Sequence, residues 1–329
     1  MEAHEPYISV LDPIGPSIEH TKTILFRPFD LDRWLAIGFC AWLATFGDGC
    51  SFNFRKNIDH EHPAAVLHEA KDIILANLPW LIPVFIVGAV IVIGLWLLFL
   101  WLSSRGRFMF LNNVVYNTSD VARPWHYYKH LAHSLLLFRV VLCLIGLGTL
   151  IGLGIVGTVV VIPLWQTSVM TAVLSLIFFI PLILLVSFGL LIIEVLTTDF
   201  IVPLMLKHTL TCTGAWSQLR NLTSFNKGRF FLYLIVKVVI NFMIGSMVLL
   251  ISLATCGCAC CLAAIPYLGT VLLLPFITFK RAYSIHYLRQ YGPYFDLLIP
   301  SPPAKPTPHE EDNQTPLGPN GNTSQEPLV

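Results

Sequence analysis

Two acidic residues lie at the end of a long apolar stretch of this chain, where an ionised side chain is costly. Glu194 and Asp199 fall within the segment IIEVLTTDFIVPLM at 192–205, and the basic residue Lys237 lies inside the next apolar stretch. Such groups can act as an acid or base, ligate an ion, or mark the point where a helix leaves the membrane. Because Glu194 and Lys237 should lie at similar depth, we predict that they pair between adjacent helices. The alternative is that each side chain reaches the interface separately.

Asp199 stands at the same place in its connection between helices as Arg107 does in the preceding connection. Arg107 is followed after 18 positions by Trp125, and Asp199 is followed after 17 positions by Trp216. This correspondence predicts that all four residues mark helix ends at the membrane interface. It also argues against a catalytic role for Asp199.

A cluster of cysteines could bind a metal or form a disulfide. Thiolates bind zinc and Cu(I), but the CxCxCC spacing differs from the paired CxxC motifs of folded zinc sites. A disulfide to Cys50 and the packing of small residues in a tight turn are the alternatives, and we favour packing. The cluster comprises Cys256, Cys258, Cys260 and Cys261.

A second cluster combines histidines with carboxylates ahead of the second long apolar stretch. Imidazole and carboxylate groups suit zinc or manganese, yet no pair here has a specific motif spacing. The same segment fits a solvated loop followed by an amphipathic helix, so we expect no metal and no other cofactor. The members of this cluster are Asp59, His60, Glu61, His62, His68, Glu69 and Asp72.

The composition is that of a membrane protein. Of the 329 residues, 55% are hydrophobic and 12% are charged, and the mean hydropathy is +0.72. The net charge of +1 gives no electrostatic case for a nucleic-acid partner. Apolar stretches predict six transmembrane helices, at 31–47, 78–102, 135–161, 171–197, 230–254 and 263–284. The first stretch is short, and a re-entrant or interfacial helix is its alternative.

Basic residues gather in alternate connections, which indicates that both termini are cytoplasmic in a protein of the cell membrane. The two long cytoplasmic connections resemble each other, so we predict three helical hairpin repeats with interfacial helices between them. The alternative is that helix ends share aromatic and basic residues by composition alone. We therefore predict an all-α integral membrane protein with a cytoplasmic segment 1–24, a six-helix domain 25–292 and a disordered, proline-rich cytoplasmic tail 293–329.

Several segments resemble those of a known family, namely FRPFDLDRWLAIGFCAWL, SSRGRFMFLNNVV, TTDFIVPLM and RAYSIHYLRQYGP. Over residues 25–292 the chain resembles a family of uncharacterised bacterial multi-pass membrane proteins. That family is similar to the membrane domain attached to some glycerophosphodiester phosphodiesterases. The resemblance implies a six-helix, repeat-built membrane domain without an established activity. The chain lacks the strand–helix alternation of the barrel that hydrolyses phosphodiesters in the enzyme members, so no catalytic residue is carried over.

These features favour a non-catalytic membrane protein that binds membrane lipids or a protein partner, or that forms a homo-oligomer as a scaffold. A transporter of small solutes or lipids is the alternative, because prolines interrupt the spans and broken helices frame many transport sites. Against transport, no predicted span has an acid at its centre. An intramembrane enzyme is a third reading, and it would need two convergent polar groups in a water-accessible cavity.

Overall fold

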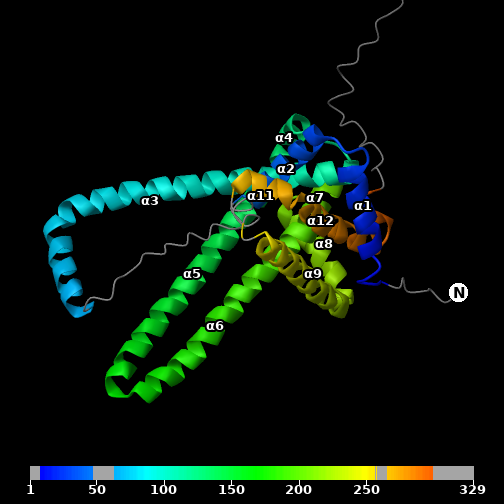
Figure 1. Ribbon diagram of the computed structural model, residues 1–329. Helices are drawn as coiled ribbons and strands as arrows, with labels where there is room; N and C mark the ends of the chain where they lie inside the picture. The colour runs from blue at the N-terminus through cyan, green and yellow to red at the C-terminus, as the bar shows by residue number, and fades with distance from the viewer. Residues whose placement is uncertain (1–7, 47–62, 256, 258–264, 299–329) are drawn as a thin grey trace, which may run out of the picture. The chain divides into compact units, whose positions relative to one another are not determined.

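The computed structural model describes residues 8–46, 63–255, 257 and 265–298, and every regular element within these residues is a helix. These residues belong to a single unit that ends at Leu298. Figure 1 shows the helices, which are α1 (Ile14–Phe26), α2 (Leu31–Thr45), α3 (Pro63–Tyr116), α4 (Ala122–Tyr127), α5 (Lys129–Thr167), α6 (Val169–Leu196), the π-turn η1 (Thr197–Ile201), α7 (Val202–His208), α8 (Cys212–Phe225), α9 (Lys227–Ala254), α11 (Pro266–Leu272), α12 (Leu274–Arg289) and the short turn η2 (Pro293–Phe295).

Four of the described helical stretches are long and apolar enough to cross a membrane. They run over Ile82–Tyr116, Lys129–Pro163, Val173–His208 and Lys227–Ala254. Many of their large apolar side chains are exposed, including Phe85 at 77% and Phe242 at 75%. So much contiguous apolar surface is not found on soluble monomers. The chain therefore has the helices of a membrane protein.

Helices α5 and α6 lie side by side as an antiparallel hairpin (Figure 1). A Cβ atom at Gly146 would lie 2.8 Å from Cδ1 of Leu190, so glycine allows the close approach of the two helices. Between Arg139 and Glu194 the hairpin carries no charged residue. Each arm is thus uncharged over roughly 25 residues, or about 37 Å at 1.5 Å per residue, which exceeds the hydrocarbon core of about 30 Å.

The first and last predicted spans do not reach that length as single helices. Helix α2 has 15 residues, which corresponds to about 22 Å. The last predicted span is divided between α11 and α12 at Leu273, next to the first turn of α12 that contains Pro275. Proline lacks the backbone N–H that a continuous helix would need there. Among the described residues, four helices therefore qualify as spans, where the sequence predicts six.

The buried core lies where the four candidate spans end, and not along their apolar stretches. It combines α1, α2, α12, η1 and α7 with the adjoining ends of α3, α5 and α9. Tyr233 from α9 stacks on Tyr283 from α12 with ring centroids 5.4 Å apart. Phe200 from η1 lies 4.8 Å from the same Tyr233 ring. These rings hold η1 against α9 and α12, and these three elements carry many of the charged residues of the site.

Helix α3 crosses α2 at very short range, and a glycine permits the contact. A Cβ atom at Gly106 would lie 2.5 Å from backbone atoms of Leu43 and Ala44. Ser103, nearly one turn earlier in α3, donates a hydrogen bond to the Ala44 carbonyl at 3.0 Å. The crossing fixes the position of Arg107, which is the next residue along α3.

Candidate functional site

The long helices carry their charges where they enter the buried core. The innermost charge of α5 is Arg139, that of α6 is Glu194 and that of α9 is Lys237. In α3, Arg105 and Arg107 follow the apolar stretch in the same way. Charges at the edge of an apolar region need a partner or water, and the structure brings these residues together.

Glu194 is shared by two arginines from neighbouring helices. Nη2 of Arg107 donates to its Oε1 at 2.5 Å, and Nη2 of Arg139 lies 3.3 Å from the same oxygen. The second guanidinium also donates from Nη1 to the hydroxyl of Ser103 at 3.1 Å. The arginine side chains are 1% and 7% exposed, whereas that of Glu194 is 34% exposed. This group therefore carries an excess of one positive charge.

Asp199 forms the second ion pair, with Lys237 of α9. Nζ of Lys237 donates to Oδ2 of Asp199, and the hydroxyl of Tyr233 donates to the same oxygen at 3.0 Å. The carboxylate side chain is 5% exposed and the lysine side chain is 12% exposed. Asp199 is thus a buried member of a polar network, and not a residue at the free end of a helix.

The π-turn η1 leaves the carbonyl of Thr198 without a backbone donor in its own helix. The N–H of Val202 is already used by the preceding carbonyl, and Pro203 has no N–H to give. Arg281 of α12 donates to this carbonyl instead. Arg107 donates to the Thr198 hydroxyl at 2.7 Å. One threonine therefore connects arginines from α3 and α12.

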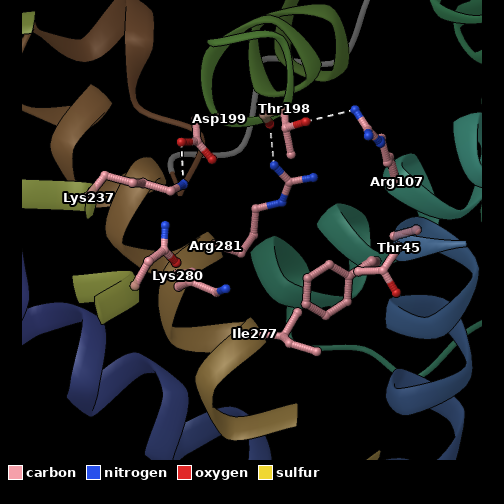
Figure 2. A pocket seen from close by; sticks show the side chains of 11 residues that line it. Thr45, Arg107, Thr198, Asp199, Lys237, Ile277, Lys280 and Arg281 are labelled. Atoms are coloured by element: carbon pink, nitrogen blue, oxygen red, sulfur yellow. Dashed lines mark hydrogen bonds and ion pairs between the residues drawn. The ribbon is translucent and has the colours of Figure 1, made fainter. Parts of the chain in front are cut away.

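A cavity of about 210 Å³ lies beside this network, and Figure 2 shows it from close by. Among the described residues, its wall carries four cations and a single carboxylate. The cations come from α3, α9 and α12, and the carboxylate comes from η1. The lining residues are Ala44, Thr45, Arg107, Phe110, Thr198, Asp199, Lys237, Asn241, Ile277, Lys280 and Arg281.

Two polar side chains of the cavity wall make no bonds within the described part of the chain. Neither the amine of Lys280 nor the amide of Asn241 forms a hydrogen bond or ion pair with another described residue. Lys280 is repelled by the like charge of Lys237 and attracted by the opposite charge of Asp199. The cavity therefore offers unused donors beside an excess of positive charge, an arrangement that suits an anion.

The ion pair that the sequence predicts between Glu194 and Lys237 is not formed. Glu194 instead contacts Arg107 and Arg139, and Lys237 contacts Asp199. The packing of the helices around the core places other partners nearer to both residues. The predicted helix ends at Arg107 and Asp199 are also wrong, because α3 continues to Tyr116 and a helix continues past η1 to His208.

Sequence reasoning missed three of the cations. Arg139 lies inside the predicted span 135–161, and Lys280 and Arg281 lie inside the predicted span 263–284. A charge within a predicted span is itself a sign of a functional or paired group, and that signal could have identified all three.

The two predicted interfacial tryptophans lie on short helices beside the candidate spans. Trp125 of α4 and Trp101 of α3 enclose the guanidinium carbon of Arg105, which is 4.7 Å and 4.6 Å from their ring centroids. Trp216 of α8 lies beside Phe138 of α5, with ring centroids 5.9 Å apart. Their location at a membrane interface stays a prediction.

The two predicted metal or disulfide clusters fall largely outside the described residues. The second cluster enters α3, which begins at Pro63, so its residues from there onward are helical. Where residues are described, no group of three or more His, Cys, Asp or Glu is placed to hold a metal ion. The residues outside the description are 59–62, Cys50, Cys256, Cys258, Cys260 and Cys261.

Comparison with known proteins gives a family without an activity. Residues 8–277 match the model of a family described as "Family of unknown function (DUF7544)". No curated protein and no solved structure matches the chain.

Proposed function

From its cavity, we propose that this chain, which belongs to the DUF7544 family of unknown function, is a non-catalytic, multi-pass membrane protein that binds a small anion. One observation supports this most directly: Arg107, Lys237, Lys280 and Arg281 face the same cavity as a single carboxylate. Grouped cations at low dielectric repel one another unless an anion joins them. The bound anion would complete the charge balance of the cavity.

The size of the cavity favours a phosphate or the phosphate of a lipid headgroup. Pockets for drug-sized ligands measure about 300–1,000 Å³, and this cavity holds about 210 Å³. Guanidinium and ammonium groups are the side chains that proteins use most for phosphate. Lys280 and Asn241 would donate to its oxygens, because both have donors that no described residue uses.

We also propose that the chain crosses the cell membrane six times as three hairpins, with both termini in the cytoplasm. The helix packing supports an even number of crossings. α2 and α12 both pack against the charged end of α3, and α9 leads away from that end through its uncharged stretch. We therefore infer one further crossing before α3 and one after α9. The divided pair α11 and α12 would make the last return.

Transport of a small anion is the second candidate, because two irregular helical segments border the cavity. The π-turn η1 supplies Thr198 and Asp199, and α12, which follows the break at Leu273, supplies Lys280. Interrupted helices commonly frame the binding sites of transporters. Uptake of labelled phosphate by proteoliposomes that contain the full chain tests this candidate directly.

Thermal unfolding of the full chain in a phosphate-free detergent tests anion binding. Inorganic phosphate or glycerol 3-phosphate is added, and chloride at equal ionic strength is the reference. At one hundred times its Kd a ligand stabilises the folded state by about 2.7 kcal/mol, so both probes should raise Tm. Native mass spectrometry of the same preparation reports a retained protein partner or a second copy of the chain.

Lys280→Gln should remove the phosphate effect, and Lys129→Gln should keep it. Lys129 is an exposed lysine at the start of α5 that does not line the cavity, so it controls for the loss of one charge. An equal response of the wild type to phosphate and chloride, or a full phosphate response in Lys280→Gln, would refute the proposal.

A further inference from the structure

A second recess, which we name the α8 groove, lies between α8, the start of α9, α5 and the end of α6. It holds about 610 Å³ and is lined by residues of these four helices, among them Phe138, Leu196, Trp216, Arg220 and Lys227. This volume falls within the range of sites for drug-sized ligands, about 300–1,000 Å³. The groove is therefore too large to be explained by a single small anion.

The floor of the groove is apolar and continues onto a candidate span. Leu196 is the last residue of α6, and Phe138 of α5 lies beside the ring of Trp216. Along α5 on the side of Phe138, Val141 and Ile145 are 52% and 58% exposed. An acyl chain that follows this face would stay in contact with apolar side chains as it leaves the groove.

The rim of the groove carries positive charge without a matching acid. Arg220 and Lys227 are exposed, and neither forms a hydrogen bond or ion pair with another described residue. No acidic residue is among those that line the groove. Nε1 of Trp216 is buried and has no hydrogen-bond partner among the described residues. The groove thus has two cations at its rim and an unused, buried indole donor in its wall, and together they complement an anionic headgroup.

The position of the groove along the helices matches the edge of a membrane. The uncharged stretch of α5 begins just after Phe138, that of α6 ends just before Leu196, and that of α9 lies beyond Lys227. The headgroup region is where basic side chains and tryptophan gather in membrane proteins. A lipid in the groove would have its phosphate at the rim and its chains in the hydrocarbon.

We propose that the α8 groove binds one anionic phospholipid. Its phosphate lies between Arg220 and Lys227, its headgroup or ester oxygen accepts from Nε1 of Trp216, and an acyl chain packs on Phe138 and Leu196. Free phosphate would leave the apolar floor uncovered, so the bilayer is the source of the ligand. This site is separate from the charged cavity. The proposal depends on the membrane location of the chain and not on anion binding in that cavity.

Native mass spectrometry tests the proposal with the full chain in detergent. The chain is titrated with phosphatidylglycerol or with phosphatidylcholine of the same acyl chains, and the retained lipids are counted. The wild type should retain one phosphatidylglycerol in preference to phosphatidylcholine. Arg220→Gln/Lys227→Gln should lower that affinity roughly thirty-fold, because each cation near an anionic lipid surface contributes a factor of roughly five.

Three further variants test the indole donor, the effect of lost charge and the independence from the charged cavity. Trp216→Phe keeps a ring against Phe138 but removes the N–H donor, so phosphatidylglycerol should bind several-fold more weakly. Lys22→Gln/Lys129→Gln removes two exposed charges away from the groove and should keep wild-type retention. Lys280→Gln should also keep it, so a failure of anion binding in the cavity leaves this test unaffected.

Three results would overturn the proposal. The first is equal retention of the two lipids by the wild type. The second is wild-type retention in Arg220→Gln/Lys227→Gln, or an equal loss in the Lys22→Gln/Lys129→Gln control. The third is that Arg220→Gln/Lys227→Gln loses a co-purifying protein but retains lipid as the wild type does. That result would assign the groove to a protein partner.

Discussion

Replacement of Lys237 by methionine should destabilise the protein, because it removes the cation that balances Asp199. The carboxylate side chain is 5% exposed, so water cannot readily take the place of the ammonium group. Methionine retains much of the apolar stem of lysine, so little packing is lost. The hydroxyl of Tyr233, 3.0 Å from Oδ2, would remain as a donor.

The expected loss can be bounded from two contributions. Breaking a buried ion pair by removing one member typically costs about 3–5 kcal/mol. The remaining hydrogen bond from Tyr233 offsets about 1 kcal/mol. We expect Lys237→Met to lower the free energy of unfolding by about 3 kcal/mol.

A double-mutant cycle separates this pair from other effects of the substitution. The free energy of unfolding is measured by titration with sodium dodecyl sulfate in mixed micelles, with circular dichroism as the signal. Asp199→Asn alone should cost less than Lys237→Met, since the longer lysine side chain can reach toward water. Lys237→Met/Asp199→Asn should be more stable than the sum of the single losses predicts, by about 2 kcal/mol.

A second cycle uses Glu194, whose cationic partners are Arg107 and Arg139. Glu194→Gln and Lys237→Met should therefore combine nearly additively. Strict additivity in the Asp199–Lys237 cycle would refute the reasoning. So would a coupling between Glu194 and Lys237 that is as large as the coupling between Asp199 and Lys237.

Three other perturbations have clear expected outcomes. Gly106→Ala should destabilise the protein by about 3 kcal/mol, because its Cβ would lie 2.5 Å from the backbone of Leu43. Gly148→Ala has open space around the new methyl group, so it should be nearly neutral in the same titration. Burial lowers the pKa of His286 to about 4. Between this pH and the ordinary histidine pKa of about 6.5 the unfolded chain binds more protons than the folded chain, so the free energy of unfolding should fall as the pH drops through this window. A flat stability profile between pH 7 and 4.5, or the same pH dependence in His286→Gln, would contradict this prediction. Cys143 is exposed within the uncharged stretch of α5, so in a variant with no other cysteine a membrane-permeant maleimide should label it in vesicles and a charged thiol reagent should not.

The sequence predicts the long helices well because their apolar side chains are exposed on nearly every side, so their stretches are uniformly apolar. The stretches 78–102, 135–161, 171–197 and 230–254 all overlap helices that qualify as spans. The stretch 31–47 is apolar for another reason. Ile37, Cys40 and Ala41 in α2 are fully buried against other helices of the core. Hydropathy alone cannot distinguish a helix that faces protein from one that faces lipid.

The charged residues of the site are visible in the sequence, but their pairing is not. Glu194, Asp199 and Lys237 are conspicuous because charge is rare in apolar surroundings. Which cation meets which carboxylate depends on the neighbours of each helix, and one-dimensional spacing contains little of that information. Pro203 is the one sequence feature that points to the π-turn, because it removes a backbone hydrogen-bond donor from the helix. The spacing of apolar residues alone does not distinguish a π-turn from an ordinary α-helical turn.

The network around Glu194 also sets an order of events during synthesis. Arg107 and Arg139 precede their shared carboxylate by 87 and 55 residues along the chain. At a synthesis rate of about 5–20 residues per second, the first guanidinium waits roughly 4–17 seconds before Glu194 emerges. During that interval it must be held by water, by the insertion machinery or by a lipid phosphate. A ribosome that stalls before codon 194 would leave both arginines without the carboxylate that they share, and such a chain should be a target for degradation.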